Sequence, residues 1–410
     1  MKKLLVLIVG LFLLSACSAD NNNNETTQVN LNEMSWEEIE RAAEETEVRL
    51  YMWGGDSGIN EYIDDYVTVE LKNKHNMTLT RVPLDTNEFL QKLLTEKKAE
   101  KDKGTIDVIW INGENFKSAK ENDLLYGPFA SKLPSVQNYI GAEAGFTQSD
   151  MGTTIDELEA PWGNVQFVMN YDASKVDNPP KSFEELKSWV AEHPGKFTYP
   201  EPTDFTGNAF IRHLLYETTE NHQKLQKPFE DVNLTSESKA MWDTLNELEP
   251  DLWRNGETYP VSLSQLDQMY SSGEVWMTMG FNEARAESLI AEGVFPESTK
   301  SYVFNEGSIG NTHYLSIPYN SPNPAGAAVA INFLLSPEAQ LKKLDSSMWG
   351  DGTVLDYTKL EEQQKNQIEL LSGGQSVVPR DVLKEKYLPE LDTSYLEWIK
   401  DEWYEEVVEK

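Results

Sequence analysis

Two polar, glycine-containing loops follow short apolar runs and carry groups that could hold a small molecule. They comprise Trp53, Gly54, Gly55, Asp56 and Ser57 in one loop and Asn112, Gly113, Glu114 and Asn115 in the other. Amide and carboxylate side chains form directional hydrogen bonds with polar solutes. Glycine lets the backbone approach a solute closely, and a helix that starts there presents free N–H groups suited to an anion. Both loops are therefore candidate binding loops.

A second group of candidates lies further along the chain. Its members are Asp204, Phe205, Thr206, Gly207, Phe281 and Asn282, with Trp162, Gln166 and Asn311 near the expected crossings between domains. Aromatic side chains such as Trp162 and Phe281 can stack on a flat or cationic ligand. Each candidate also has a structural alternative, because Asp204 and Thr206 suit helix N-caps and buried aromatic rings are common at domain seams. The sequence leaves both interpretations open.

The sequence contains none of the catalytic motifs that we sought. It lacks a Gly-x-Ser-x-Gly elbow, a His-Glu-x-x-His zinc motif and a Walker loop, and its 5 histidines are scattered. We therefore predict a protein that binds without catalysis and has no catalytic residue, no metal and no cofactor. An envelope-anchored hydrolase acting on a phosphate or glycan substrate is the alternative.

The elements that must position these loops alternate between strands and helices. Ser35 and Glu38 form a capping box that opens a first helix. Strand-like runs at 48–53, 77–84 and 106–111, of which the first and third are apolar, are separated by helical patterns. Such strands indicate an α/β fold with a parallel sheet covered on both faces. Ligands bind outside the carboxyl ends of these strands, which is where the candidate loops lie.

A second strand and helix series indicates a second domain. It begins with a strand at 165–171, includes another at 274–279, and returns toward the first domain over 302–318. We expect two lobes, each a mostly parallel sheet flanked by helices, joined by a hinge with two crossovers near 163–170 and 304–312. The expected divisions are 34–163 and 305–410, with the C-terminal helices, for the first lobe, and 164–304 for the second.

The N-terminus predicts export and lipidation. Lys2 and Lys3 precede an apolar run that is too short to span a membrane, which is typical of a secretory signal peptide. Small residues then precede Cys17, as in a lipobox. We expect 1–16 to be cleaved, Cys17 to be lipidated and 17–33 to form a flexible tether, which places the protein outside the cytoplasm on a membrane. Cys17 is the only cysteine, so an intramolecular disulfide is excluded.

The charge of the chain excludes one class of partner. Formal net charge is -34, and loss of the two leader lysines would make it -36. A charge of this sign and size argues against binding to nucleic acid or anionic lipid. We expect neither as a partner.

Several segments resemble extracellular solute-binding proteins of the iron, polyamine and thiamine type. The segment 330–340 resembles their C-terminal helix signature, and 50–55, 106–116, 160–163 and 204–207 look like the YnjB branch of that family. The resemblance implies the two-lobed periplasmic-binding-protein fold of type II. It also implies delivery of a small solute to the permease of an ABC transporter.

The sequence gives opposing indications of the charge of that solute. Helix N-termini and backbone amides favour an anion. Glu114, Asp204, aromatic faces and the overall acidity favour a cation such as a polyamine or thiamine-like amine. We expect a cationic or zwitterionic ligand slightly more than an anionic one.

Overall fold

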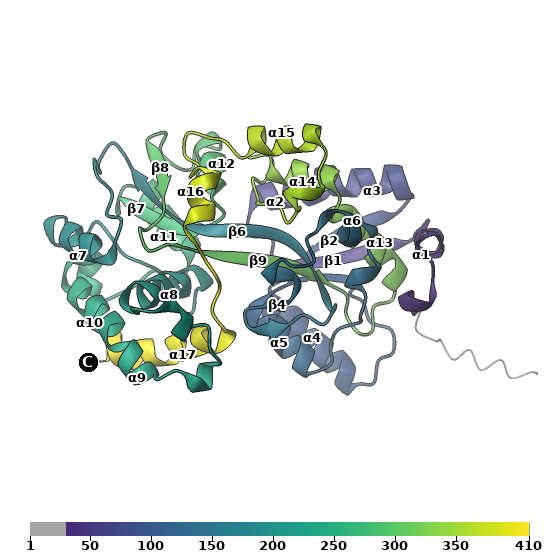
Figure 1. The fold of residues 1–410 in the computed structure, drawn as a ribbon, viewed down its shortest axis with the longest axis horizontal. Coiled ribbons are helices and arrows are strands. Elements are labelled where there is room, and N and C mark those ends of the chain that lie inside the picture. The colour runs from purple at the N-terminus through teal and green to yellow at the C-terminus, as the bar shows by residue number, and fades with distance from the viewer. Residues whose placement is uncertain (1–29, 410) are drawn as a thin grey trace, which may run out of the picture.

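The computed structural model describes residues 30–409, so the expected signal peptide, Cys17 and most of the expected tether lie outside the described residues. Figure 1 shows two bodies side by side, connected by long strands. One sheet of eight strands runs through both, in the order β2-β1-β3-β9-β6-β7, with β10 beside β9 and β8 beside β6.

The first lobe contains the predicted parallel strands. β1 (Glu47–Met52) pairs in parallel with β2 (Thr78–Pro83) and with β3 (Val108–Ile111). The helices of this lobe are α1 (Trp36–Ala43), α2 (Ser57–Glu61), α3 (Thr68–His75), α4 (Thr86–Lys98), α5 (Gly113–Glu121), α6 (Pro134–Tyr139), α13 (Pro324–Leu334), α14 (Pro337–Leu344) and α15 (Glu362–Leu371). A small hairpin, β4 (Ser149–Asp150) and β5 (Thr153–Thr154), lies beside α5 in Figure 1. Ser35 and Glu38 form the predicted capping box at α1.

The second lobe differs from the predicted parallel arrangement. β6 (Glu159–Asp172) pairs antiparallel with β7 (Met277–Phe281) and with β8 (Thr299–Tyr302). β7 and β8 therefore both run back toward the first lobe. The order of the strands along the chain does not show this direction, so the sequence did not predict it. The helices of this lobe are α7 (Phe183–Glu192), α8 (Phe205–Thr218), α9 (Leu234–Glu237), α10 (Lys239–Leu248), α11 (Leu263–Ser271) and α12 (Arg285–Ala291).

β6 and β9 (Ser308–Ser316) connect the lobes, at the two expected crossovers. They pair antiparallel from Glu159 opposite Ser316 to Gln166 opposite Gly310, with a register shift between Pro161 and Gly163. We call this pair of strands the crossover ribbon. Because side chains alternate along a strand, the ribbon presents one set of residues to each of its two faces.

The chain crosses between the lobes a third time, after α15. α15 contributes Ile368 to a cluster with Leu344 of α14 in the first lobe. α16 (Arg380–Glu385) then packs Leu383 against Val168 of the second lobe, and β10 (Tyr387–Leu388) pairs with β9. The crossing is complete before α16 begins, because Ser376 Oγ already donates to Thr299 O of β8.

The final helix, α17 (Thr393–Trp403), packs on the second lobe. Its Tyr395, Ile399 and Trp403 are buried in the same core as Phe210 of α8 and Leu245 of α10. The expectation that 305–410 belongs to the first lobe is therefore wrong for this helix. Its apolar side chains fit either lobe equally well on the basis of sequence, and only the third crossing decides between them.

Candidate functional site

A cavity of about 510 Å³ lies between the two lobes and reaches the crossover ribbon. Ten predicted residues line it: Trp53, Gly55, Asp56, Asn112, Asp204, Phe205, Thr206, Phe281, Asn282 and Asn311. They come from the ends of β1, β3 and β7, from the start of α8 and from β9. The rule that binding loops gather at the carboxyl ends of strands therefore selected ten of the 26 residues that line this cavity.

The first lobe contributes an exposed aromatic ring and a fixed amide. Trp53 follows the last residue of β1 and keeps 45% of its surface exposed. Asp56 caps α2, since its Oδ1 accepts a hydrogen bond from Ile59 N at 3.1 Å. Asn112 follows β3, and its Nδ2 donates to Asn311 Oδ1 of the ribbon at 3.3 Å.

The second lobe contributes an aromatic pair beside a capping carboxylate. Asp204 Oδ1 accepts hydrogen bonds from the backbone N–H of Thr206 at 2.8 Å and of Gly207 at 3.1 Å, at the start of α8. Its Oδ2 accepts from Leu263 N of α11 at 2.9 Å. Both carboxylate oxygens therefore stabilise helix starts, as the structural alternative proposed. Phe205, which is 38% exposed, lies 5.3 Å from the ring of Phe281.

Arg285, at the start of α12, lines the cavity and was not predicted. Its Nη2 donates to Asp267 Oδ2 at 2.7 Å, whereas its Nη1 is buried and has no hydrogen-bond partner in the described part of the chain. Thr278 of β7 donates to the other oxygen of Asp267 at 2.8 Å. The sequence signal was a cation three residues after Asn282, within the loop-to-helix segment that we had selected.

The floor of the cavity rests on a buried charged cluster that sequence analysis also missed. Asp351 accepts hydrogen bonds from His313 Nε2 at 3.0 Å and from Lys343 Nζ, and Lys343 also donates to Gly352 O at 2.5 Å. Burial alone would raise the pKa of Asp351, but His313 and Lys343 outweigh that effect and lower it. Asp351 therefore stays ionised at neutral pH.

Aromatic rings cover this cluster. Trp349 stacks on His313 at 6.0 Å between ring centroids, and Trp110 lies 5.1 Å from His313. Trp110 and Trp349 both line the cavity. Trp110 is in the middle of β3, where its side chain points to the cavity face of the sheet, so only knowledge of the strand pairing could have selected it.

Eight predicted residues do not line this cavity. They are Gly54, Ser57, Gly113, Glu114, Asn115, Trp162, Gln166 and Gly207. Ser57 lies at the rim, where its Oγ donates to Glu292 Oε1 of the second lobe at 3.3 Å. Trp162 has no exposed surface and packs against Trp110 and Trp349, which makes it a core residue.

Three of these eight residues are engaged elsewhere for clear reasons. Glu114 accepts from Lys400 Nζ of α17 at 2.9 Å, and so joins the two lobes by an ion pair. Gly113 N donates to Asp150. A side chain at Gly207 would collide with the backbone oxygen of Pro200, so this glycine is required by packing.

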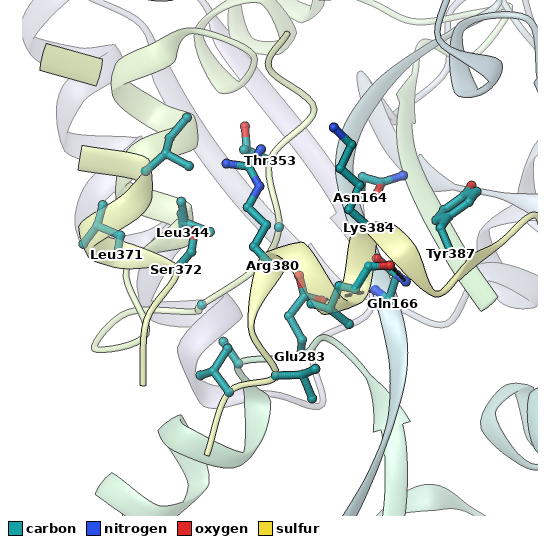
Figure 2. Close-up of a pocket in the computed structure, with 17 residues that line it drawn as sticks. Asn164, Gln166, Glu283, Leu344, Thr353, Leu371, Ser372, Arg380, Lys384 and Tyr387 are labelled. Atoms are coloured by element: carbon teal, nitrogen blue, oxygen red, sulfur yellow. Dashed lines mark hydrogen bonds between the residues drawn. The ribbon is translucent and has the colours of Figure 1, made fainter. Parts of the chain in front are cut away.

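Gln166 faces the opposite side of the ribbon. Its Nε2 donates to Leu383 O at 3.0 Å, and it lines a separate cavity of about 390 Å³. Figure 2 shows Gln166 and Asn164 among the side chains of that cavity, together with Arg380 and Lys384 of α16. The expectation that Gln166 lies with the other candidates is therefore wrong, because the strand alternation directs its side chain to the other face.

Within residues 30–409, no helix is both long and apolar enough to cross a membrane. The same residues contain no group of three or more histidine, cysteine, aspartate or glutamate side chains that could hold a metal ion. The cavity instead offers aromatic faces, amides and one guanidinium nitrogen, which are groups that bind an organic solute.

Known proteins resemble this chain in sequence and in fold. A family model for bacterial extracellular solute-binding proteins matches residues 67–368. The protein YnjB of Escherichia coli (strain K12) is 35% identical over 370 residues, which cover 90% of this chain and 92% of YnjB.

Solved structures agree at the level of the fold. The substrate-binding protein PotD of a spermidine/putrescine ABC transporter from Streptococcus pneumoniae strain Canada MDR_19A has a TM-score of 0.60 at 16% identity, with 88% of this chain and 98% of PotD covered. An ABC transporter protein from Clostridium perfringens ATCC 13124 has a TM-score of 0.59 at 19% identity, with 88% and 98% covered. The match to the family model over 67–368 and the 35% identity to YnjB show that this chain belongs to the bacterial extracellular solute-binding protein family and is the solute-binding protein of an ABC transporter.

Proposed function

We propose that this protein captures a small polar solute in the cavity between its lobes and releases it unchanged to a membrane permease. The observation that supports this proposal is a cavity lined from the first lobe, the second lobe and the crossover ribbon. A solute bound there contacts both lobes at once, so it stabilises the closed arrangement over an open one. No residue of the cavity is assigned a catalytic role.

Two carboxylates on which the expectation of a cationic solute partly rested already have partners. Glu114 is paired with Lys400, and both oxygens of Asp204 accept backbone hydrogen bonds. Glu114 is therefore neutralised by a cation of α17, whereas Asp204 keeps its negative charge and uses both oxygens at helix starts.

Native mass spectrometry of the purified protein tests the capture of a solute directly. We expect a retained small molecule of unchanged mass, which is lost on unfolding, and a smaller radius of gyration by X-ray scattering when it is present. Turnover of the retained molecule would instead support the hydrolase alternative.

We further propose that lipidated Cys17 holds the protein at the outer face of a membrane. The supporting observations are the apolar leader and the small residues before Cys17. The wild-type protein is expected in the membrane fraction with an N-terminal peptide that carries acyl chains, whereas Cys17→Ala releases it from the membrane. A wild-type N-terminal peptide that carries no acyl chain on Cys17 would exclude the anchor.

A further inference from the structure

Some hydrogen-bond donors of the cavity have no partner, whereas most of its acceptors do. Two buried donors, Arg285 Nη1 and Asn311 Nδ2, have no hydrogen-bond partner among the described residues, and both residues line the cavity. A buried donor without an acceptor costs free energy, so it is commonly completed by water or by a ligand. Acceptor atoms on a solute would supply the partners that these donors lack.

The carboxylates that line the same cavity are mostly engaged by contrast, although Oδ2 of Asp56 has no hydrogen-bond partner among the described residues. Asp204 caps α8 and accepts from Leu263 N, and Asp351 is paired with Lys343 and His313. Asp56 caps α2, and Glu292 is an exposed rim residue that accepts from Ser57. The negative charges that line the cavity favour a cationic solute. The two buried donors without partners instead favour a solute that carries an oxygen acceptor.

Arg285 is oriented by its own ion pair. Asp267, which is 6% exposed, holds Nη2 at 2.7 Å and leaves the other arm of the planar guanidinium for a second acceptor. A guanidinium binds carboxylate and phosphate oxygens through such fixed N–H groups. Asn311 is held in the same way, since its Oδ1 accepts from Asn112 and its Nδ2 remains available.

The rest of the cavity is aromatic on both sides. Trp53, Trp110 and Trp349 line it from the first lobe, and Phe205 and Phe281 line it from the second. Trp53 and Phe205 keep unusually large exposed surfaces for aromatic residues of this chain. Flat, unsaturated groups are held by such opposed rings.

We infer that the solute carries a carboxylate or phosphate group, bound by Arg285 and Asn311, on a flat unsaturated body held between the aromatic rings. This inference rests on the proposed function, because it assigns a chemical class to the solute of the same cavity. It includes zwitterions that bear such an oxyanion, and it excludes polyamines, which have neither an oxyanion nor a flat body.

Three ring compounds that differ in one group test this class. Benzoate, phenyl phosphate and benzylamine should be titrated into the full chain by calorimetry and by tryptophan fluorescence. We expect benzoate or phenyl phosphate to bind at least tenfold more tightly than benzylamine, and the stronger of the two identifies the oxyanion. Tighter binding of benzylamine, or no binding of any of the three, overturns the inference.

Two variants connect this selectivity to the proposed groups. Asn311→Asp replaces the free donor by a negative acceptor of the same size, and should weaken binding of the oxyanion compounds at least tenfold without weakening benzylamine. Arg285→Lys keeps the pairing with Asp267 but loses the second guanidinium arm, and should weaken the same compounds about tenfold. Asn138→Asp, on the exposed side of α6, adds the same charge far from the cavity and serves as the control.

Failure of the inference differs from failure of the proposed function. A retained cation without an oxyanion, found by native mass spectrometry, leaves capture intact and overturns the class. A retained oxyanion that Asn311→Asp holds as tightly as wild type also overturns the assigned groups. No retained solute in any preparation, with no binding of the ring compounds, contradicts both.

Discussion

Two buried charged clusters face the same cavity and differ in how completely their hydrogen bonds are made. In the first lobe, Asp351 accepts from both Lys343 and His313, and Lys343 also donates to a backbone carbonyl. In the second lobe, Asp267 occupies one arm of Arg285 and leaves the other without a partner among the described residues. The first cluster is complete by itself, whereas the second lacks an acceptor.

This difference indicates that the first-lobe cluster supports the cavity, whereas the second-lobe cluster recognises the solute. A complete cluster of buried charges fixes the geometry of the floor, and it has nothing further to offer to a solute. An incomplete cluster holds one group in position with a hydrogen bond still to be made. Changes in the first-lobe cluster should therefore affect mainly stability, and changes in the second-lobe cluster should affect mainly binding.

The largest effect is expected from Lys343→Met. This change leaves the buried carboxylate of Asp351 without its closest cation, so the free energy of unfolding should fall by about 3 to 5 kcal/mol. Denaturant unfolding measures it. Lys342→Met is the control, because Lys342 is partly exposed and pairs with Asp345; an equal loss in the control would refute the role of the cluster.

A titration effect of about 2 kcal/mol is expected from His213 in the second lobe. Its Nδ1 contacts Ala209 O at 2.7 Å, its Nε2 accepts from Ile309 N at 2.9 Å, and burial lowers its pKa to about 3. The unfolded chain, in which a histidine has a pKa near about 6.5, therefore takes up the proton first as the pH falls. Stability should decrease between pH 7 and pH 5 by about 2 kcal/mol from this group.

His213→Gln removes that titration while keeping an amide that can hydrogen bond. The unfolding free energy of the variant should depend on pH less steeply than that of wild type over the same interval. Parallel pH profiles of the two proteins would show that His213 is not responsible.

Arg285→Lys is expected to change binding and hardly change stability. Affinity for an oxyanion-bearing ring compound should fall about tenfold, which is roughly 1.4 kcal/mol. The unfolding free energy should change by less than about 1 kcal/mol, because the ammonium still pairs with Asp267. The reverse pattern, lost stability and unchanged affinity, would place Arg285 with Lys343 as a support.

The smallest effects come from a matched pair of first-lobe residues. Trp53→Ala should weaken solute binding severalfold, because an exposed ring in the cavity is lost. Glu114→Ala removes a partly exposed ion pair, so it should cost less than about 1 kcal/mol of stability and leave affinity unchanged. Calorimetric titration of both variants checks this contrast, and equal losses of affinity would contradict it.

The sequence predicted the loops of the cavity better than the contacts within them. Trp53, Asn112, Asp204 and Phe281 were selected because strand ends converge in an α/β sheet, and all four line the cavity. The partners of Arg285 and Asp351 are brought together only by tertiary packing. Gln166 was misplaced because the sequence does not show which face of the ribbon an alternating side chain occupies.

The fold, too, was predicted where it depends on local patterns and was not predicted where it depends on tertiary packing. The parallel strands of the first lobe were predicted because strand-like runs, two of them largely apolar, alternate there with helical patterns. The antiparallel pairing of β6 with β7 and β8, and the placement of α17, depend on the path of the chain between lobes. The path of the chain between the lobes cannot be predicted from local sequence patterns.

The third crossing has a consequence for the order in which the protein can be assembled. The first lobe is not complete until α15 has joined α14, and the second still lacks Tyr395, Ile399, Trp403 and Val407 at that point. A chain delivered from its N-terminus onward therefore contains no finished lobe until nearly all of it has emerged. The two lobes can therefore complete their folding only late and close together in time. A chain truncated shortly before α17 would have a complete first lobe and an incomplete second lobe.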